Sequence, residues 1–129
     1  MNGLGAGLDE ARTVAATVGE HPVGARVAIC PPATLIHRMA DLLAGSGVEV
    51  GGQDCRAEET GAYTGDLSAE MLADAGASLV ILGHSERRAG YGETDALVAA
   101  KVEAALERLR ELAPEQGLAS PAPSASPAP

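Results

Sequence analysis

The chain has 129 residues, of which 46% are hydrophobic and 21% charged, and this composition is typical of one folded domain. Because Trp and Phe are absent, any core must be aliphatic. The formal net charge of −9 at pH 7 argues against nucleic acid or an anionic membrane as a partner. No apolar run approaches the roughly 18 residues that cross a bilayer, and no signal peptide is visible. We therefore expect a cytoplasmic protein.

Helical and strand patterns alternate along the chain. An amphipathic helix is predicted over residues 8–18. Short runs rich in β-branched residues and Leu, bounded by Gly or Pro, predict buried strands at 26–30, 48–52 and 78–83. Between them, apolar spacing predicts a helix around residues 35–43, and Ser68 can cap a second one over 68–75. This alternation predicts an α/β fold with a parallel sheet.

The last helix shows a clear periodicity. An apolar stripe is expected to face the core, and Lys101 is expected on the side that faces away. The stripe consists of Val98, Val102, Ala105, Leu109 and Leu112. Thr94 can cap this helix. We expect the folded part to span residues 1–113 and residues 114–129 to form a disordered tail, because the chain ends in Ser, Pro and Ala only.

The two cysteines, Cys30 and Cys55, are not arranged as metal ligands. The spacing predicts two free thiols in a reducing compartment. We expect neither a metal ion nor a cofactor.

One group of polar residues follows a predicted strand directly. His84 and Glu86 come just after the run at 78–83, and ligands of parallel α/β sheets bind at the carboxyl ends of the strands. A histidine in this position is by itself more often structural than catalytic, although the neighbouring carboxylate and arginines favour a functional role. His21 and His37 have no such setting and are interpreted as surface residues.

The residues around His84 resemble a known family. The segment 80–88 (VILGHSERR) is similar to the triosephosphate isomerase signature around the catalytic histidine. The segments 61–66 (GAYTGD) and 68–72 (SAEML) resemble the family's long third loop and the helix that follows it. Residues 91–95 (YGETD) resemble the next stretch, and the similarity runs without a gap from Met1 to about Leu109.

The resemblance implies a function and a set of site residues. Members interconvert glyceraldehyde 3-phosphate and dihydroxyacetone phosphate in glycolysis and gluconeogenesis, and they are homodimers. By resemblance His84 is the catalytic electrophile, Ser85 lines the substrate pocket, and Glu86 supports the site. Thr64 and Glu93 correspond to dimer-interface residues, and Arg87 and Arg88 to structural ion-pair partners.

One residue departs from the family pattern. Asp54 stands where the family usually has Asn after Gln53. Its carboxylate is expected to add negative charge near the interface loop.

The implied fold is a (β/α)8 TIM barrel, which takes about 250 residues. The chain corresponds to its second, third and fourth strands, so we expect a partial barrel of about three β/α units. By resemblance the glutamate base, the catalytic Asn and Lys, and the phosphate-binding loops lie outside it. We therefore expect a truncated isomerase that is inactive alone. The alternative is a non-catalytic half-barrel fragment or the product of a decayed gene. An unrelated flavodoxin-like phosphate binder is disfavoured, because the residues after each strand match the isomerase.

Overall fold

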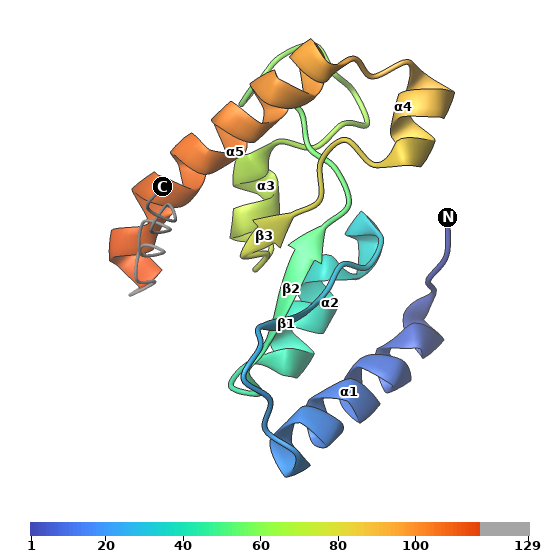
Figure 1. The fold of residues 1–129 in the computed structure, drawn as a ribbon, viewed down its shortest axis with the longest axis vertical. Coiled ribbons are helices and arrows are strands. Elements are labelled where there is room, and N and C mark those ends of the chain that lie inside the picture. Colours follow the sequence, from blue (N-terminus) through green and yellow to red (C-terminus); the bar gives the residue numbers. More distant parts are fainter. Residues whose placement is uncertain (117–129) are drawn as a thin grey trace, which may run out of the picture.

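The computed structural model describes residues 1–116. For residues 109, 110 and 112–116 it describes the backbone alone. Figure 1 shows its elements in chain order. Most of the expected tail at 114–129 lies outside the described residues.

Three parallel strands form the sheet, in the order β1-β2-β3. They are β1 (Val27–Ile29), β2 (Val48–Gly52) and β3 (Leu79–Val80). The prediction of a parallel sheet is confirmed. β2 has the predicted bounds, whereas β1 and β3 are shorter than predicted, since β3 pairs only with Gly51 and Gly52 at the end of β2.

Helices alternate with the strands. The 3-10 helix η1 (Gly5–Gly7) leads into α1 (Leu8–Glu20), and the others are α2 (Ala33–Leu43), α3 (Ala69–Asp74), α4 (Ser85–Tyr91) and α5 (Asp95–Gln116). The predicted caps are confirmed, because Ser68 accepts the amide of Met71 at 3.2 Å and Thr94 accepts that of Leu97 at 3.2 Å. α4 was not predicted. α5 continues to Gln116, past the residue at which we expected the folded part to end.

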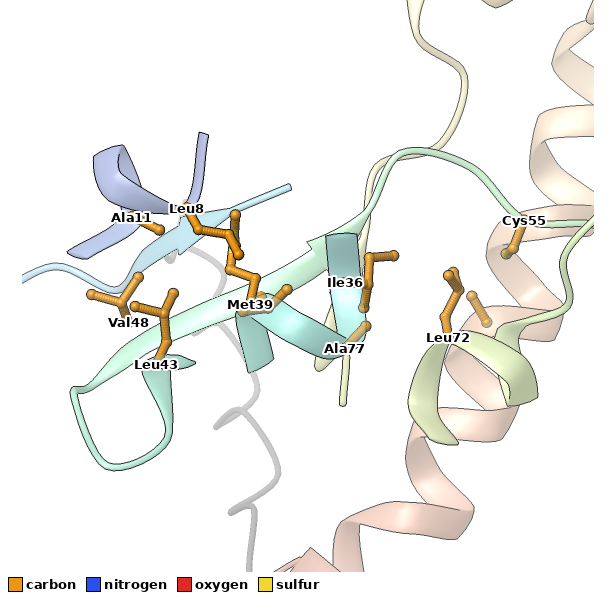
Figure 2. Close-up of a cluster of buried hydrophobic side chains, with 11 residues drawn as sticks. Leu8, Ala11, Ile36, Met39, Leu43, Val48, Cys55, Leu72 and Ala77 are labelled. Carbon is orange, nitrogen blue, oxygen red and sulfur yellow. The ribbon is translucent and has the colours of Figure 1, made fainter. Parts of the chain in front are cut away.

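The core lies where α1 and α2 cover one face of β2 (Figure 2). Ile36 of α2 is only 1% exposed, and Val48 and Val50 of β2 point toward the same helix face. The cluster continues to Leu72 of α3 and Ala105 of α5. The side chains are small and aliphatic, so the core depends on close packing and on the area removed from water.

The orientation of α5 differs from the prediction. Lys101, expected to face away, is buried at 5% exposure, whereas Val102 of the expected apolar stripe is 39% exposed. The face of α5 that lies inward includes Lys101 and Ala105. The periodicity was misleading because the buried ammonium of Lys101 is paired with acidic side chains, one of which, Asp54, lies 47 residues away in the sequence.

The thiols of Cys30 and Cys55 are free, as predicted, with Cys55 buried and Cys30 half-buried. Burial raises the pKa of the Cys55 thiol to about 11, so the thiol stays protonated at neutral pH. None of the described helices is long and apolar enough to cross a membrane.

The core position of Ile36 leads to a stability prediction. Ile36→Ala removes a fully buried side chain, and we expect it to lower the free energy of unfolding by about 2–5 kcal/mol. Ile81→Ala is the matched control, because the same atoms are removed from a side chain that is 42% exposed. The control should cost less than about 1 kcal/mol. Urea titration measures both values, and equal losses would contradict this assignment of the core.

Candidate active site

The segments that follow the three strands are tied together at one edge of the sheet. The Gln53 side-chain amide, just after β2, donates to the carbonyl of Cys30 after β1 at 2.9 Å. The amide of Ile81, just after β3, donates to the carbonyl of Gly52 at 2.9 Å. These bonds align the ends of the three strands and place the segment after β3 beside the end of β2.

Gly83 makes the turn between β3 and α4. Its φ of +70° is left-handed, and a Cβ there would lie 2.8 Å from Cγ1 of Val98. The guanidinium Nε of Arg88 donates to the Gly83 carbonyl at 2.8 Å. Only a glycine fits this conformation and spacing, so the backbone direction from which His84 follows β3 is fixed.

His84 is the N-cap of α4. Its Nδ1 accepts the backbone amide of Glu86 at 3.1 Å. Because an acceptor nitrogen carries no proton, the neutral imidazole must hold its hydrogen on Nε2. The side chain is 49% exposed, so this Nε2–H can be offered to a molecule at the strand ends.

Ser85 and Glu86 occupy the first turn of α4, and both are exposed. The carboxylate of Glu86 is 85% exposed, and its Oε2 lies 4.0 Å from Nδ1 of His84. The close contact to the imidazole is therefore made by the Glu86 amide rather than by its carboxylate.

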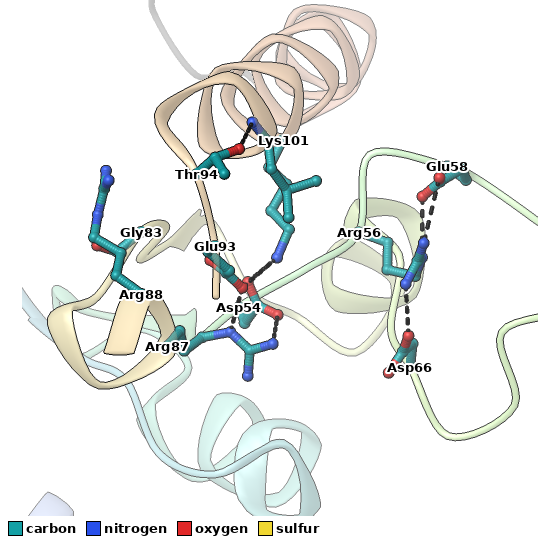
Figure 3. A network of polar contacts seen from close by, with 11 residues as sticks. Asp54, Arg56, Glu58, Asp66, Gly83, Arg87, Arg88, Glu93, Thr94 and Lys101 are labelled. Carbon is teal, nitrogen blue, oxygen red and sulfur yellow. Dashed lines mark hydrogen bonds and ion pairs between the residues drawn. The ribbon is translucent and has the colours of Figure 1, made fainter. Parts of the chain in front are cut away.

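Next to this turn lies an ion cluster of two carboxylates and two cations, which we call the charge quartet (Figure 3). It consists of Asp54, Arg87, Glu93 and Lys101. Arg87 reaches Glu93 at 2.8 Å with Nε and Asp54 at 3.0 Å with Nη2. Lys101 reaches the same two residues, at 2.8 Å and 3.0 Å. Every charge in the quartet thus faces two charges of opposite sign.

The quartet shifts the titration of its members. The hydrogen bond from Lys101 and the one from Arg87 lower the pKa of Glu93, although burial opposes this. For Lys101, burial lowers the pKa, but hydrogen bonds to Glu93 and Asp54 outweigh it and the net direction is upward. Glu93 is 3% and Lys101 6% exposed at the side chain, so both stay ionised in a site almost closed to water.

Sequence reasoning found Glu93 and its ion-pair partner Arg87, but it missed the second partner, Lys101. Lys101 was assigned to the outer face of α5, and Asp54 was noted only as a departure from the family pattern. A buried lysine cannot be recognised from helical periodicity when its partner Asp54 lies 47 residues away in the sequence. The sequence did contain one signal, because charged residues follow two of the predicted strands closely, Asp54 after 48–52 and Arg87 after 78–83.

The loop from residue 54 to residue 68 carries Thr64 at an exposed turn, closed by the bond from the Asp66 amide to the Tyr63 carbonyl at 2.9 Å. Gly65 has φ of +92°, which this turn requires. Arg56 stabilises the loop, because its guanidinium donates hydrogen bonds to Glu58 at 3.0 Å and to Asp66 at 2.9 Å. Its guanidinium lies 3.6 Å from the Tyr63 ring centroid. Thr64 is far along the chain from His84 and belongs to a separate surface feature.

Among the side chains that the structure describes, no group of three or more His, Cys, Asp or Glu is arranged to hold a metal ion. The chemistry offered by the strand ends is hydrogen-bond donation from a neutral imidazole, next to a compact charged cluster.

The quartet leads to a pH prediction. A carboxylate with a lowered folded-state pKa stabilises the fold above its ordinary value of 4.5, and that stability is lost as the pH falls through the lowered pKa. We expect Glu93→Gln to lower the free energy of unfolding by about 3 kcal/mol at pH 7. The loss of stability on acidification should also be shallower than in the unmodified chain.

Glu86→Gln is the matched control for this prediction, because the Glu86 carboxylate is exposed. Its unfolding free energy should follow that of the unmodified chain from pH 7 to pH 3. Urea titrations across that range measure all three proteins. If Glu93→Gln shows the same acid dependence as the unmodified chain, Glu93 is not ionised in the quartet.

The comparisons with known proteins agree with the fold and the strand-end residues. The sequence model of the family described as Triosephosphate isomerase matches residues 2–112. The chain is 61% identical over 105 residues to a triosephosphate isomerase of Caulobacter vibrioides, covering 81% of this chain and 42% of that protein. For a triosephosphate isomerase of Ruegeria pomeroyi the identity is 60% over 108 residues, with coverage of 83% and 42%.

A solved structure gives the same result. The crystal structure of triosephosphate isomerase from Bartonella henselae superposes with a TM-score of 0.79 at 50% identity, covering 84% of this chain and 45% of that one. The described residues are therefore part of a TIM barrel, and the chain spans less than half the length of these relatives. With a family match across most of its length, the chain belongs to the triosephosphate isomerase family.

Proposed function

We propose that this chain supplies the histidine-bearing part of a triosephosphate isomerase active site. The observation that carries the proposal is the hydrogen bond from the Glu86 amide to Nδ1 of His84. In the neutral imidazole this bond leaves the proton on Nε2, at the strand edge where barrel enzymes bind their substrates. A neutral donor can stabilise a developing oxyanion without first losing a charge.

The substrate is a triose phosphate, glyceraldehyde 3-phosphate or dihydroxyacetone phosphate. In the family a glutamate base takes a proton from the carbon next to the carbonyl and returns it to the neighbouring carbon. His84 donates through Nε2–H to the carbonyl oxygen, which carries the negative charge of the enediolate. Ser85, exposed beside it, lines the pocket, and the first turn containing Glu86 holds the imidazole. The reaction serves glycolysis and gluconeogenesis in the cytoplasm.

The active site needs parts that the relatives have and this chain does not span, since it covers 42% of the Caulobacter protein. We assign the glutamate base and the phosphate-binding loops to those parts. A positioned general base alone contributes about 10²–10⁴ in rate, so His84 cannot turn over substrate by itself. The exposed Thr64 turn and the buried Glu93 support the homodimer interface of the complete enzyme.

The activity prediction uses complementation. The 129-residue chain alone should not convert glyceraldehyde 3-phosphate at a measurable rate. Mixed with a segment that supplies the remaining strands of a family enzyme, it should gain activity, and His84→Gln should reduce that activity by about 10²–10³. A coupled spectrophotometric assay measures each rate.

Two variants serve as comparisons. His37→Gln makes the same substitution at an exposed histidine of α2, 72% exposed at the side chain, and should leave the rate unchanged. Ser85→Ala should lower the rate less than His84→Gln, because Ser85 shapes the pocket whereas His84 contacts developing charge. Complemented activity that survives His84→Gln would refute the proposed role. Complete absence of activity in every mixture would favour a non-catalytic fragment.

A further inference from the structure

The helix that carries His84 is not held by hydrophobic burial. α4 has seven residues, and none of them is buried. A helix this short is unstable in isolation, and most protein helices are stabilised by packing an apolar face. Tyr91, its one large apolar side chain, is 74% exposed. The first turn of α4 must therefore be held by other contacts.

Arg87 makes the contacts that reach furthest into the molecule. Its guanidinium bonds Glu93 with Nε at 2.8 Å and Asp54 with Nη2 at 3.0 Å. In Figure 3 the Arg87 side chain points from α4 toward these carboxylates, whereas Arg88 points away from them. Arg88 pairs with Asp95, whose side chain is 95% exposed, and such a pair contributes little. The bond from Arg88 to the Gly83 carbonyl holds it to the turn before α4 and not to β2 or α5.

The carboxylates that Arg87 contacts are themselves fixed. Asp54 directly follows Gly52 and Gln53 at the end of the central strand β2. The Glu93 side chain is 3% exposed, and Lys101 of α5 bonds both carboxylates. Without Lys101 the two negative charges would repel each other across a small buried space. Asp54, Glu93 and Lys101 thus form an anchor that joins β2 to α5.

We propose that Arg87 is a positioning residue for His84, which it holds in one orientation and one tautomer by fastening the first turn of α4 to Asp54 and Glu93. The catalytic meaning of this device rests on the function proposed above for His84. The device itself is a property of the folded chain and does not depend on turnover.

The geometry connects Arg87 to the imidazole through one helical turn. The amide of Arg87 donates to the carbonyl of His84 at 2.9 Å, and the preceding amide, that of Glu86, donates to Nδ1 at 3.1 Å. If the side chain of Arg87 loses its anchor, this turn can open while the core stays folded. When the Glu86 amide moves away, nothing selects the Nε2–H tautomer.

The planar fork of the guanidinium matters for this role. Arg87 contacts two carboxylates from different segments at once, so its orientation is fixed as well as its distance. A lysine would keep the charge but present a single ammonium. Arg87→Lys is therefore expected to hold the turn less well than Arg87 and better than an uncharged residue.

The test uses NMR on the isotope-labelled 129-residue chain at neutral pH. Amide hydrogen exchange at Glu86 reports the first turn of α4, and exchange at Met39 in the buried part of α2 reports the core. Long-range ¹H–¹⁵N spectra of the imidazole report the His84 tautomer. The variants are Arg87→Met and Arg87→Lys. The matched control is Arg56→Met, which also removes an arginine with two carboxylate partners but lies outside α4.

The unmodified chain should show the Nε2–H tautomer. In Arg87→Met, exchange at Glu86 should become at least about tenfold faster with Met39 unchanged, and the His84 signals should show a mixture of tautomers. Arg87→Lys should give an intermediate result, and Arg56→Met should match the unmodified chain at both positions. These readouts need no activity. If the NMR results are as expected but complementation yields no activity, the proposed function is wrong and the positioning role of Arg87 still holds.

Three results would overturn the proposal. The first is unchanged Glu86 exchange and tautomer in Arg87→Met. The second is equal acceleration at Glu86 and Met39, which would show a role in global stability only. The third is an unmodified chain without a predominant Nε2–H form. If Arg87→Met does not fold, the shape-preserving Asp54→Asn decides, because it removes the negative charge of one of the two carboxylates that Arg87 contacts and should loosen Glu86 but not Met39.

Discussion

A buried ammonium group needs negative charge within hydrogen-bond distance, and Lys101 meets this need with carboxylates from two other segments. Asp54 comes from the end of β2, and Glu93 from the turn between α4 and α5. Because neither carboxylate could be buried without a cation, the positions of β2, α4 and α5 are mutually dependent. The arrangement around His84 follows from this constraint, since Arg87 uses the same two carboxylates.

The charge count of the quartet explains the residue at position 54. With Arg87, Lys101 and Glu93 alone, the cluster would carry a net positive charge at a partly buried site. Asp54 brings the balance to two positive and two negative charges, so the carboxylate expected to add charge near the interface loop is paired within the chain. The departure from the family's usual Asn is therefore compatible with this fold, and it strengthens the link between β2 and α4.

The parts of the fold that hydrophobic patterning controls could be predicted from the sequence. β2 was predicted with its observed bounds, and the caps Ser68 and Thr94 were identified because their chemistry is local. α4 was missed, since seven residues with no buried side chain leave no periodic signal. The position of Lys101 was predicted wrongly for a related reason. Pairing between residues distant in sequence is not visible to any local pattern, and both contacts of Asp54 in the charge quartet are of this kind.

The two modes of stabilisation differ in what they can fix. Hydrophobic packing of Ile36 and Val50 holds α2 against β2, but it is non-directional and leaves the orientation of an exposed side chain open. Hydrogen-bonded ion pairs are directional, and a guanidinium between two carboxylates fixes an angle as well as a distance. The strands thus bring their ends to one edge through apolar burial, whereas the imidazole at that edge is oriented by polar contacts. A catalytic donor that must face one oxygen atom of a substrate requires the second kind of restraint, because a small rotation would remove its hydrogen bond.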